Sequence, residues 1–269
     1  MHTRVRHARR ALGSVRAFDV GLANLAGALL LFLALPVVLI VVSATPARLA
    51  ETALDEQVLR SAWVTFGGAT LACILGLVGG VPLAYLLARH RFRGKRLVEG
   101  LLGLPVIIPH TSAGVALLLV YGARGPLGQP LARLGLFMTD RVAGIVVAML
   151  FVGVPFLVTT ARVAIAAVDR DLEQAALVDG ATPWAVLWRV TLPLARRGIA
   201  AGTVLMWARG VSEFGAVVLL AYHPRTLAVL VYERFQGFGL AQATPLAALL
   251  VLVALGLFVL LGVLTRERE

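Results

Sequence analysis

The chain has 269 residues, of which 59% are apolar and only 14% are charged, against about 25% charged in an ordinary soluble domain. This composition leaves too little polar surface to cover a water-soluble globule, so it excludes a soluble enzyme, a disordered tail and a secreted disulfide scaffold. The net charge of +11 would indicate a nucleic-acid partner in a soluble chain, but here the basic residues lie between apolar stretches. We therefore predict a membrane protein with no nucleic-acid partner.

Six apolar runs have the length of about 20 residues that a helix needs to cross the hydrocarbon core. They predict an all-α polytopic membrane protein, a single transmembrane domain over 1–269 with a tail at 1–19. The first run follows a basic tail and is too long for a signal peptide, so we interpret it as an uncleaved span. The predicted spans cover about 20–42, 62–88, 98–121, 142–168, 199–221 and 245–264.

The basic residues alternate from side to side along this predicted topology. Of the 25 Lys and Arg residues, 17 lie in the tails and in the segments 89–96 and 162–197, while seven lie in the other loops and Arg209 lies within a span. Because positively charged loops face the cytoplasm, both termini and the loop 169–198 are predicted to be cytoplasmic.

The third span contains polar and helix-breaking residues at predicted membrane depth. Pro105 and Pro109 interrupt the helical hydrogen-bond ladder, and His110, Thr111 and Ser112 follow. Freed backbone groups are tolerated at depth only where they are buried in protein or face a water-filled cavity. These residues are therefore either a cavity lining or a buried, hydrogen-bonded histidine that fixes packing.

The cytoplasmic loop 169–198 has the signals of two short helices joined by a sharp bend. Asp169 or Asp171 suits a helix N-cap, and Gly180 suits a C-terminal turn. Thr182 and Pro183 then suit the start of a second short helix. A lipid surface or a partner protein could cover its apolar face, and the bend favours a protein groove. That face consists of Trp184, Leu187 and Trp188.

The fifth span carries Arg209 and Glu213, which are four residues apart and therefore share one helix face. Charged groups at membrane depth are energetically unfavourable, so each is expected to have a structural or functional role. Two compatible interpretations remain: an ion pair that eases insertion, or a polar patch with Ser212 on a translocation path or its gate.

The loop 169–198 resembles the EAA loop of type I ABC importer permeases. That pattern is Glu-Ala-Ala, three residues, Gly, nine residues, Ile, one residue and Leu-Pro, and this chain keeps the spacing from Gln174 to Pro193. Three residues depart from the pattern: Gln174 replaces Glu although Glu173 precedes it, Val190 replaces Ile, and Asp179 is more polar than usual. The resemblance implies a methionine-importer-like fold and a coupling helix that docks on a cytoplasmic ATPase. The coupling residues so implied are Glu173, Gln174, Ala175, Ala176, Asp179, Gly180, Ala181, Pro183, Trp184, Leu187, Leu192 and Pro193.

The chain has no Walker A, Gly-x-Ser-x-Gly or His-Glu-x-x-His pattern, so we expect no catalytic residue, metal site or cofactor on it. The resemblance implies two copies of this chain, two ATPase subunits that bind ATP and Mg, and an extracytoplasmic oxyanion-binding protein. It also implies the plasma (inner) membrane of a prokaryote.

Two further segments narrow the resemblance to oxyanion permeases. The stretches 207–216 and 104–114 are similar to the fifth and third spans of permeases for molybdate, tungstate and sulfate, and His110 is closer to the molybdate/tungstate branch. The expected function is a dimeric path for molybdate or tungstate. The residues so implied on the path or its gate are Pro109, His110, Thr111, Ser112, Arg209, Ser212, Glu213, Phe214 and Gly215.

Several alternatives stay open at this point. A sulfate or thiosulfate permease has the same motifs. An ATP-independent secondary transporter would use His110, Arg209 and Glu213 as a proton relay, but it would not explain the loop motif. A cation or polyamine importer of the same fold would suit Glu213, and an intramembrane enzyme lacks a recognisable nucleophile.

Overall fold

The computed structural model describes the backbone of residues 2–265 and the side chains of residues 19–256. The described residues form helices without strands, so they confirm the prediction of an all-α protein. The chain divides into two compact units, one formed by Glu56–Glu233 and the other by Met1–Asp55 together with Arg234–Glu269. Each unit is described by itself below.

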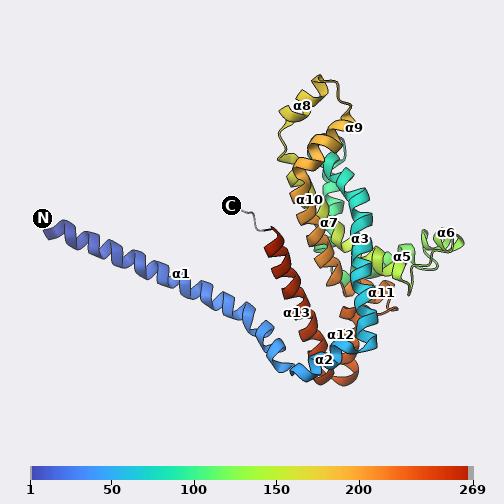
Figure 1. Ribbon diagram of the computed structural model, residues 1–269, viewed down its shortest axis with the longest axis horizontal. Coiled ribbons are helices and arrows are strands. Elements are labelled where there is room, and N and C mark those ends of the chain that lie inside the picture. The colour runs from blue at the N-terminus through green and yellow to red at the C-terminus, as the bar shows by residue number, and fades with distance from the viewer. Residues whose placement is uncertain (1, 266–269) are drawn as a thin grey trace. The chain divides into compact units, whose positions relative to one another are not determined.

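The larger unit is built on three long helices that pack along one another: α3 (Glu56–Arg89), α7 (Val142–Ala166) and α10 (Leu192–Val211) (Figure 1). Small residues let these helices approach closely, as expected for helices that associate in a membrane. A Cβ atom on Gly202 of α10, for example, would lie only 3.1 Å from the backbone oxygen of Leu157 on α7. The centre of the bundle therefore has little room for larger side chains.

Shorter helices connect and cover these three. In chain order they are α4 (Lys95–Ile107), α5 (His110–Tyr121), α6 (Gly128–Arg133), α8 (Arg170–Val178), α9 (Pro183–Val186), the π-helical turn η1 (Leu187–Thr191) and α11 (Gly215–Leu220), and α12 (Leu227–Phe238) begins in this unit. Figure 1 shows α8 and α9 together at one end of the bundle, whereas α5 and α11 lie further along it.

The smaller unit contains α1 (His2–Ser43), α2 (Pro46–Leu54) and α13 (Leu240–Thr265), and α13 packs against both of the others. Thr45 caps α2 because its hydroxyl accepts a hydrogen bond from the backbone N–H of Arg48 at 3.4 Å. Pro46 occupies the first turn, where its missing N–H has no helical partner to lose.

By length and composition, three helical segments of the described residues can cross a membrane: Asp19–Ser43, Glu56–Arg89 and Val142–Ala166. They overlap the predicted first, second and fourth spans. The predicted sixth span, 245–264, falls on α13, whose apolar part is described as far as Gly256. The total of six spans, and the side on which the termini lie, stay predictions.

The two remaining predicted spans, 98–121 and 199–221, are each interrupted within their length instead of forming one continuous helix. The chain bends by 117° between α4 and α5, at Ile108 and Pro109, and the bent pair counts as a fourth span only if its two halves are taken together. Ile108 is extended, as the residue before a proline prefers, and Pro109 cannot donate to the helical ladder. The fifth predicted span breaks between Val211 and Gly215.

Candidate functional site

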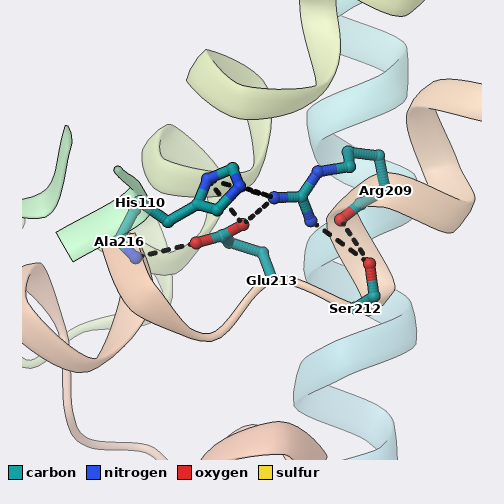
Figure 2. A network of polar contacts seen from close by, with 5 residues as sticks. All are labelled: His110, Arg209, Ser212, Glu213 and Ala216. Atoms are coloured by element: carbon teal, nitrogen blue, oxygen red, sulfur yellow. Dashed lines mark hydrogen bonds and ion pairs between the residues drawn. The ribbon is translucent and has the colours of Figure 1, made fainter. Parts of the chain in front are cut away.

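A buried carboxylate lies at the break between α10 and α11 (Figure 2). Arg209 donates a hydrogen bond from Nη2 to Oε2 of Glu213 at 2.7 Å, and the Glu213 side chain is only 1% exposed. The other carboxylate oxygen, Oε1, accepts the backbone N–H of Ala216 at 2.7 Å. Glu213 therefore neutralises an arginine and also caps the first turn of α11, where backbone N–H groups lack helical partners.

His110 joins this pair from the first residue of α5. Nη2 of Arg209 lies 2.8 Å from Nε2 and 3.1 Å from Nδ1 of the imidazole, and Nδ1 lies 3.6 Å from Oε2 of Glu213. A guanidinium can only donate hydrogen bonds, so the ring nitrogen that it contacts must offer a lone pair.

Ser212 completes the network on the side away from the histidine. Its hydroxyl accepts a hydrogen bond from Nη1 of Arg209 at 3.2 Å and donates one to the carbonyl oxygen of Arg209 at 3.1 Å. The Ser212 N–H closes the last turn of α10 on the carbonyl of Ala208. The polar side chains thus replace backbone hydrogen bonds that the helix loses where it breaks.

Two glycines bring α5 and α11 into close contact beside the network. A Cβ atom on Gly215 would lie 2.7 Å from the Cβ atom of His110, and one on Gly114 would lie 3.0 Å from the Cα atom of Ala216. Real Cβ atoms do not approach so closely, so any larger residue would push these helices apart. The packing therefore fixes the position of His110 relative to Glu213.

The structure gathers most of the residues predicted for the path, but not all. Thr111 and Ser112 are exposed on α5 and lie outside the hydrogen-bond network, and Pro109 is the exposed residue that precedes the helix. Phe214 packs against the ring of Tyr232, with 5.0 Å between the ring centres. The sequence analysis missed the capping role of Glu213, which an acid just before a short helix could have signalled.

The loop between α7 and α10 begins with a well-capped helix, α8. The carboxylate of Asp169 accepts the N–H of Asp171 at 2.9 Å. At the other end Gly180 has a φ of +89°, and the N–H of Ala181 reaches the carbonyl of Ala176 at 3.0 Å. This is the Schellman arrangement, in which the left-handed residue is most often glycine.

The second helix of the loop differs from the expected short, separate helix. Thr182 caps it by accepting the N–H of Ala185 at 3.2 Å, but α9 then continues through η1 directly into α10. In η1 the N–H of Leu192 bonds the carbonyl of Leu187, five residues back. This wider turn comes just before Pro193, which has no N–H and whose ring conflicts with an ordinary helical turn.

The tip of this loop presents an exposed apolar face. Trp184 and Trp188 are 68% and 54% exposed, and their rings meet edge to face with 5.7 Å between centres. Leu187, from the same predicted face, is half-buried. Of the other predicted loop residues, Gln174, Ala175, Asp179, Gly180 and Pro183 are exposed at the tip, Pro193 is exposed at the start of α10, and Ala176, Ala181 and Leu192 are half-buried.

Glu173 alone of the predicted loop residues makes an ion pair that reaches the bundle. Its Oε1 accepts hydrogen bonds from Nη2 of Arg89, at the end of α3, at 2.9 Å, and from the hydroxyl of Thr191 at 2.6 Å. The side chains of Arg89 and Glu173 are 7% and 12% exposed. Sequence reasoning missed Arg89 and Thr191, because no local pattern relates them to Glu173.

The sequence of this chain is similar to those of known membrane transport proteins. The family described as binding-protein-dependent transport system inner membrane component matches residues 80–266. The chain is 42% identical over 240 residues to a probable molybdenum ABC transporter permease of Haloferax volcanii, covering 89% of this chain and 88% of that one. It is 37% identical over 241 residues to a molybdate/tungstate transport system permease of Pyrococcus abyssi, and the match covers 89% of this chain and 92% of the relative.

A probable sulfate transport system permease of Zygnema circumcarinatum is 31% identical over 222 residues, covering 81% of this chain and 77% of the relative. Two solved structures share the fold at 20% identity. One is a bacterial ABC transporter that imports alginate, with a TM-score of 0.64 over 95% of this chain and 98% of the other. The second is the inward-facing MetNI methionine ABC transporter, with a TM-score of 0.60 over 79% of this chain and 100% of the other.

Proposed function

Because the chain belongs to the family of binding-protein-dependent transport system inner membrane components, we propose that it is the permease subunit of an ATP-driven importer of molybdate or tungstate. The observation that carries the choice of substrate is the identity to relatives named for molybdenum, molybdate or tungstate, which is 34–42%. The relatives named for sulfate reach 31%. A sulfate or thiosulfate importer is therefore the second candidate.

In this proposal the chain works in the plasma membrane of a prokaryote, with six spans and both termini in the cytoplasm. Two copies form the path, two ATPase subunits bind ATP and Mg, and an extracytoplasmic binding protein delivers the oxyanion. The exposed Trp184 and Trp188 support the docking of an ATPase on the loop 169–198, because aromatic side chains of this exposure gather at protein interfaces.

We place the translocation gate at the network of His110, Arg209, Ser212 and Glu213. An oxyanion only accepts hydrogen bonds, and the guanidinium group of Arg209 in this network can donate them. Glu213 cancels much of the positive field of Arg209, so the site would attract a passing anion without holding it tightly. Weak binding suits a path, because tight binding would slow release.

ATP binding would close the two ATPases, move the docking loops with them and turn the path outward, and hydrolysis would return it inward. This is a shift between two states that the nucleotide and the loaded binding protein bind with different affinity. The permease itself has no chemical step in this cycle. Selection among oxyanions falls to the binding protein, and the permease need only let them pass.

The first test is to purify the tagged chain from its native membrane in mild detergent and to measure the mass of the intact complex. Two copies of this chain with two ATPase chains are expected. Trp184→Asp should remove the ATPases and leave the chain in the membrane, whereas Phe137→Ser, on a loop predicted to face outward, should keep them. A chain that runs alone, where a control importer stays whole, would contradict the proposal.

The second test separates the substrates. Uptake of tungstate into proteoliposomes that hold the whole complex is expected to depend on ATP and on the binding protein, and molybdate should compete with it. Competition by sulfate at the same concentration as molybdate would instead favour the sulfate importer.

A further inference from the structure

Three segments of the chain meet at one carboxylate oxygen. Oε1 of Glu173, in the first turns of α8, accepts hydrogen bonds from Arg89 at the end of α3 and from Thr191 in η1. Nη2 of Arg89 also donates to the carbonyl of Val168, just before α8, at 2.9 Å. We call the set of Arg89, Glu173 and Thr191 the junction.

The junction attaches α8 to the end of α3 and to η1. No residue of α8 is fully buried, and the helix has only nine residues. A helix of this length is not stable alone in water, so tertiary contacts must hold it. Glu173 supplies such a contact from a side chain that is 12% exposed, whereas its neighbour Gln174 is exposed and makes no comparable bond in the described structure.

Separating Glu173 from Arg89 is energetically unfavourable. Both charged side chains are almost wholly removed from solvent. Pulling Glu173 away from Arg89 would leave an uncompensated buried charge, which is much less favourable than the intact pair. A force on α8 is therefore carried to α3 and, through Thr191, to the base of α10.

We propose that the junction transmits movement of the docking loop to α3 and α10, with Glu173 as a positioning residue for transport. This inference rests on the proposed function, since it assumes that an ATPase moves the loop. The exposed tryptophans dock, and Glu173 acts on the inner side of the same loop. A variant that lacks the junction should still bind the ATPase and hydrolyse ATP, but hydrolysis should no longer open the gate.

One experiment tests the mechanical link without any partner. Hydrogen exchange of the α8 amides is measured in the purified full chain in lipid nanodiscs. Glu173→Gln and Thr191→Val should each speed exchange in α8 by about tenfold and leave α7 unchanged, because only the local opening becomes easier. Asp171→Asn, which removes an exposed charge from the same turn, and Thr203→Val, which removes a hydroxyl from α10, are the controls. Equal exchange in all variants would overturn the proposal.

A second experiment tests transmission in the reconstituted complex with its ATPase and binding protein. The readout is tungstate carried per ATP hydrolysed, a ratio that loss of folded protein alone does not change. For Glu173→Gln this ratio should fall by about tenfold while the hydrolysis rate stays within about twofold. A parallel fall of both rates, or no fall, would overturn the proposal. If the wild-type complex carries no oxyanion, the proposed function is wrong, and the exchange measurement still decides whether the junction holds α8.

Discussion

Two arginine–glutamate pairs in the larger unit look alike and are built differently. At the break after α10, Arg209 and Glu213 are four residues apart on one chain segment, and the carboxylate is 1% exposed. At the junction, Arg89 and Glu173 are 84 residues apart, and both side chains are nearly buried. Each pair has a third polar partner, His110 in one case and Thr191 in the other.

The difference separates two uses of a buried charge. The Arg209–Glu213 pair compensates itself locally, and its oxygen atoms also replace helical hydrogen bonds at a break. It leaves N–H donors of Arg209 near a partly exposed histidine, which is where the proposed function has the anion pass. The Arg89–Glu173 pair instead joins segments that are distant in sequence, which suits a mechanical connection better than a binding site.

The largest expected effect tests the local pair. Glu213→Ala should lower the free energy of unfolding by roughly 3–5 kcal/mol, because it leaves Arg209 without its counter-charge and the N–H of Ala216 without an acceptor. Thermal unfolding in detergent measures the loss. The double variant Arg209→Leu with Glu213→Leu should recover part of it. A single variant as stable as the wild type would show that the break does not depend on the carboxylate.

The second prediction concerns the contact that holds His110 against the break. Gly215→Ala should destabilise the protein by roughly 1–3 kcal/mol, because its Cβ atom would press against the Cβ atom of His110. The unfolding temperature is the measurement. Gly103→Ala is the matched control: this helix position has nothing within 4 Å, so the change should be neutral or slightly stabilising. Equal effects at both positions would contradict the close approach.

The third prediction concerns a glycine in the loop 169–198. Gly180 has open space around its Cα atom but a φ of +89°, so Gly180→Ala should be less stable by roughly 1–2 kcal/mol from backbone strain alone. Gly180→Asn should be less harmful, because asparagine tolerates the left-handed region. Hydrogen exchange of α8 measures both. A harmless alanine would mean that the turn after α8 takes another conformation.

The smallest effect concerns a third ion pair, outside the predicted spans, between Arg225 and Glu233. Burial acts to raise the pKa of Glu233, but hydrogen bonds from Tyr222 and Arg225 and the charges of Arg225 and His223 together hold this pKa below its ordinary value of 4.5. The stability that the pair contributes is therefore present above pH 4.5 and is lost as the pH falls through the lowered pKa.

We expect this contribution to be below about 1 kcal/mol, because the pair is partly exposed and screened. The difference in unfolding temperature between wild type and Glu233→Gln, measured from pH 7 to acid, should shrink as the pH falls. A difference that grows in acid would mean that the carboxylate is destabilising where it lies.

The sequence by itself determined the features that depend on local chemistry. Apolar composition required an all-helical membrane protein, because only helices satisfy their own backbone groups over such long apolar runs. Gly180 and Thr182 marked two ends of the loop helices, and the start of the first was narrowed to Asp169 or Asp171, because capping acts within four residues. The spacing of Arg209 and Glu213 likewise placed both on one helix face, because residues four apart are neighbours on a helix surface.

Only the tertiary structure decided how those local pieces meet. Hydropathy could not show that the helix after Thr182 continues into α10, or that α10 ends at Val211, because apolar runs look the same on both sides of a break. It could not place His110 against Glu213, since the contact depends on the fit of Gly114 and Gly215 between α5 and α11. It could not pair Arg89 with Glu173, because a contact across 84 residues leaves no periodic trace and arises only where the end of α3 meets the first turn of α8.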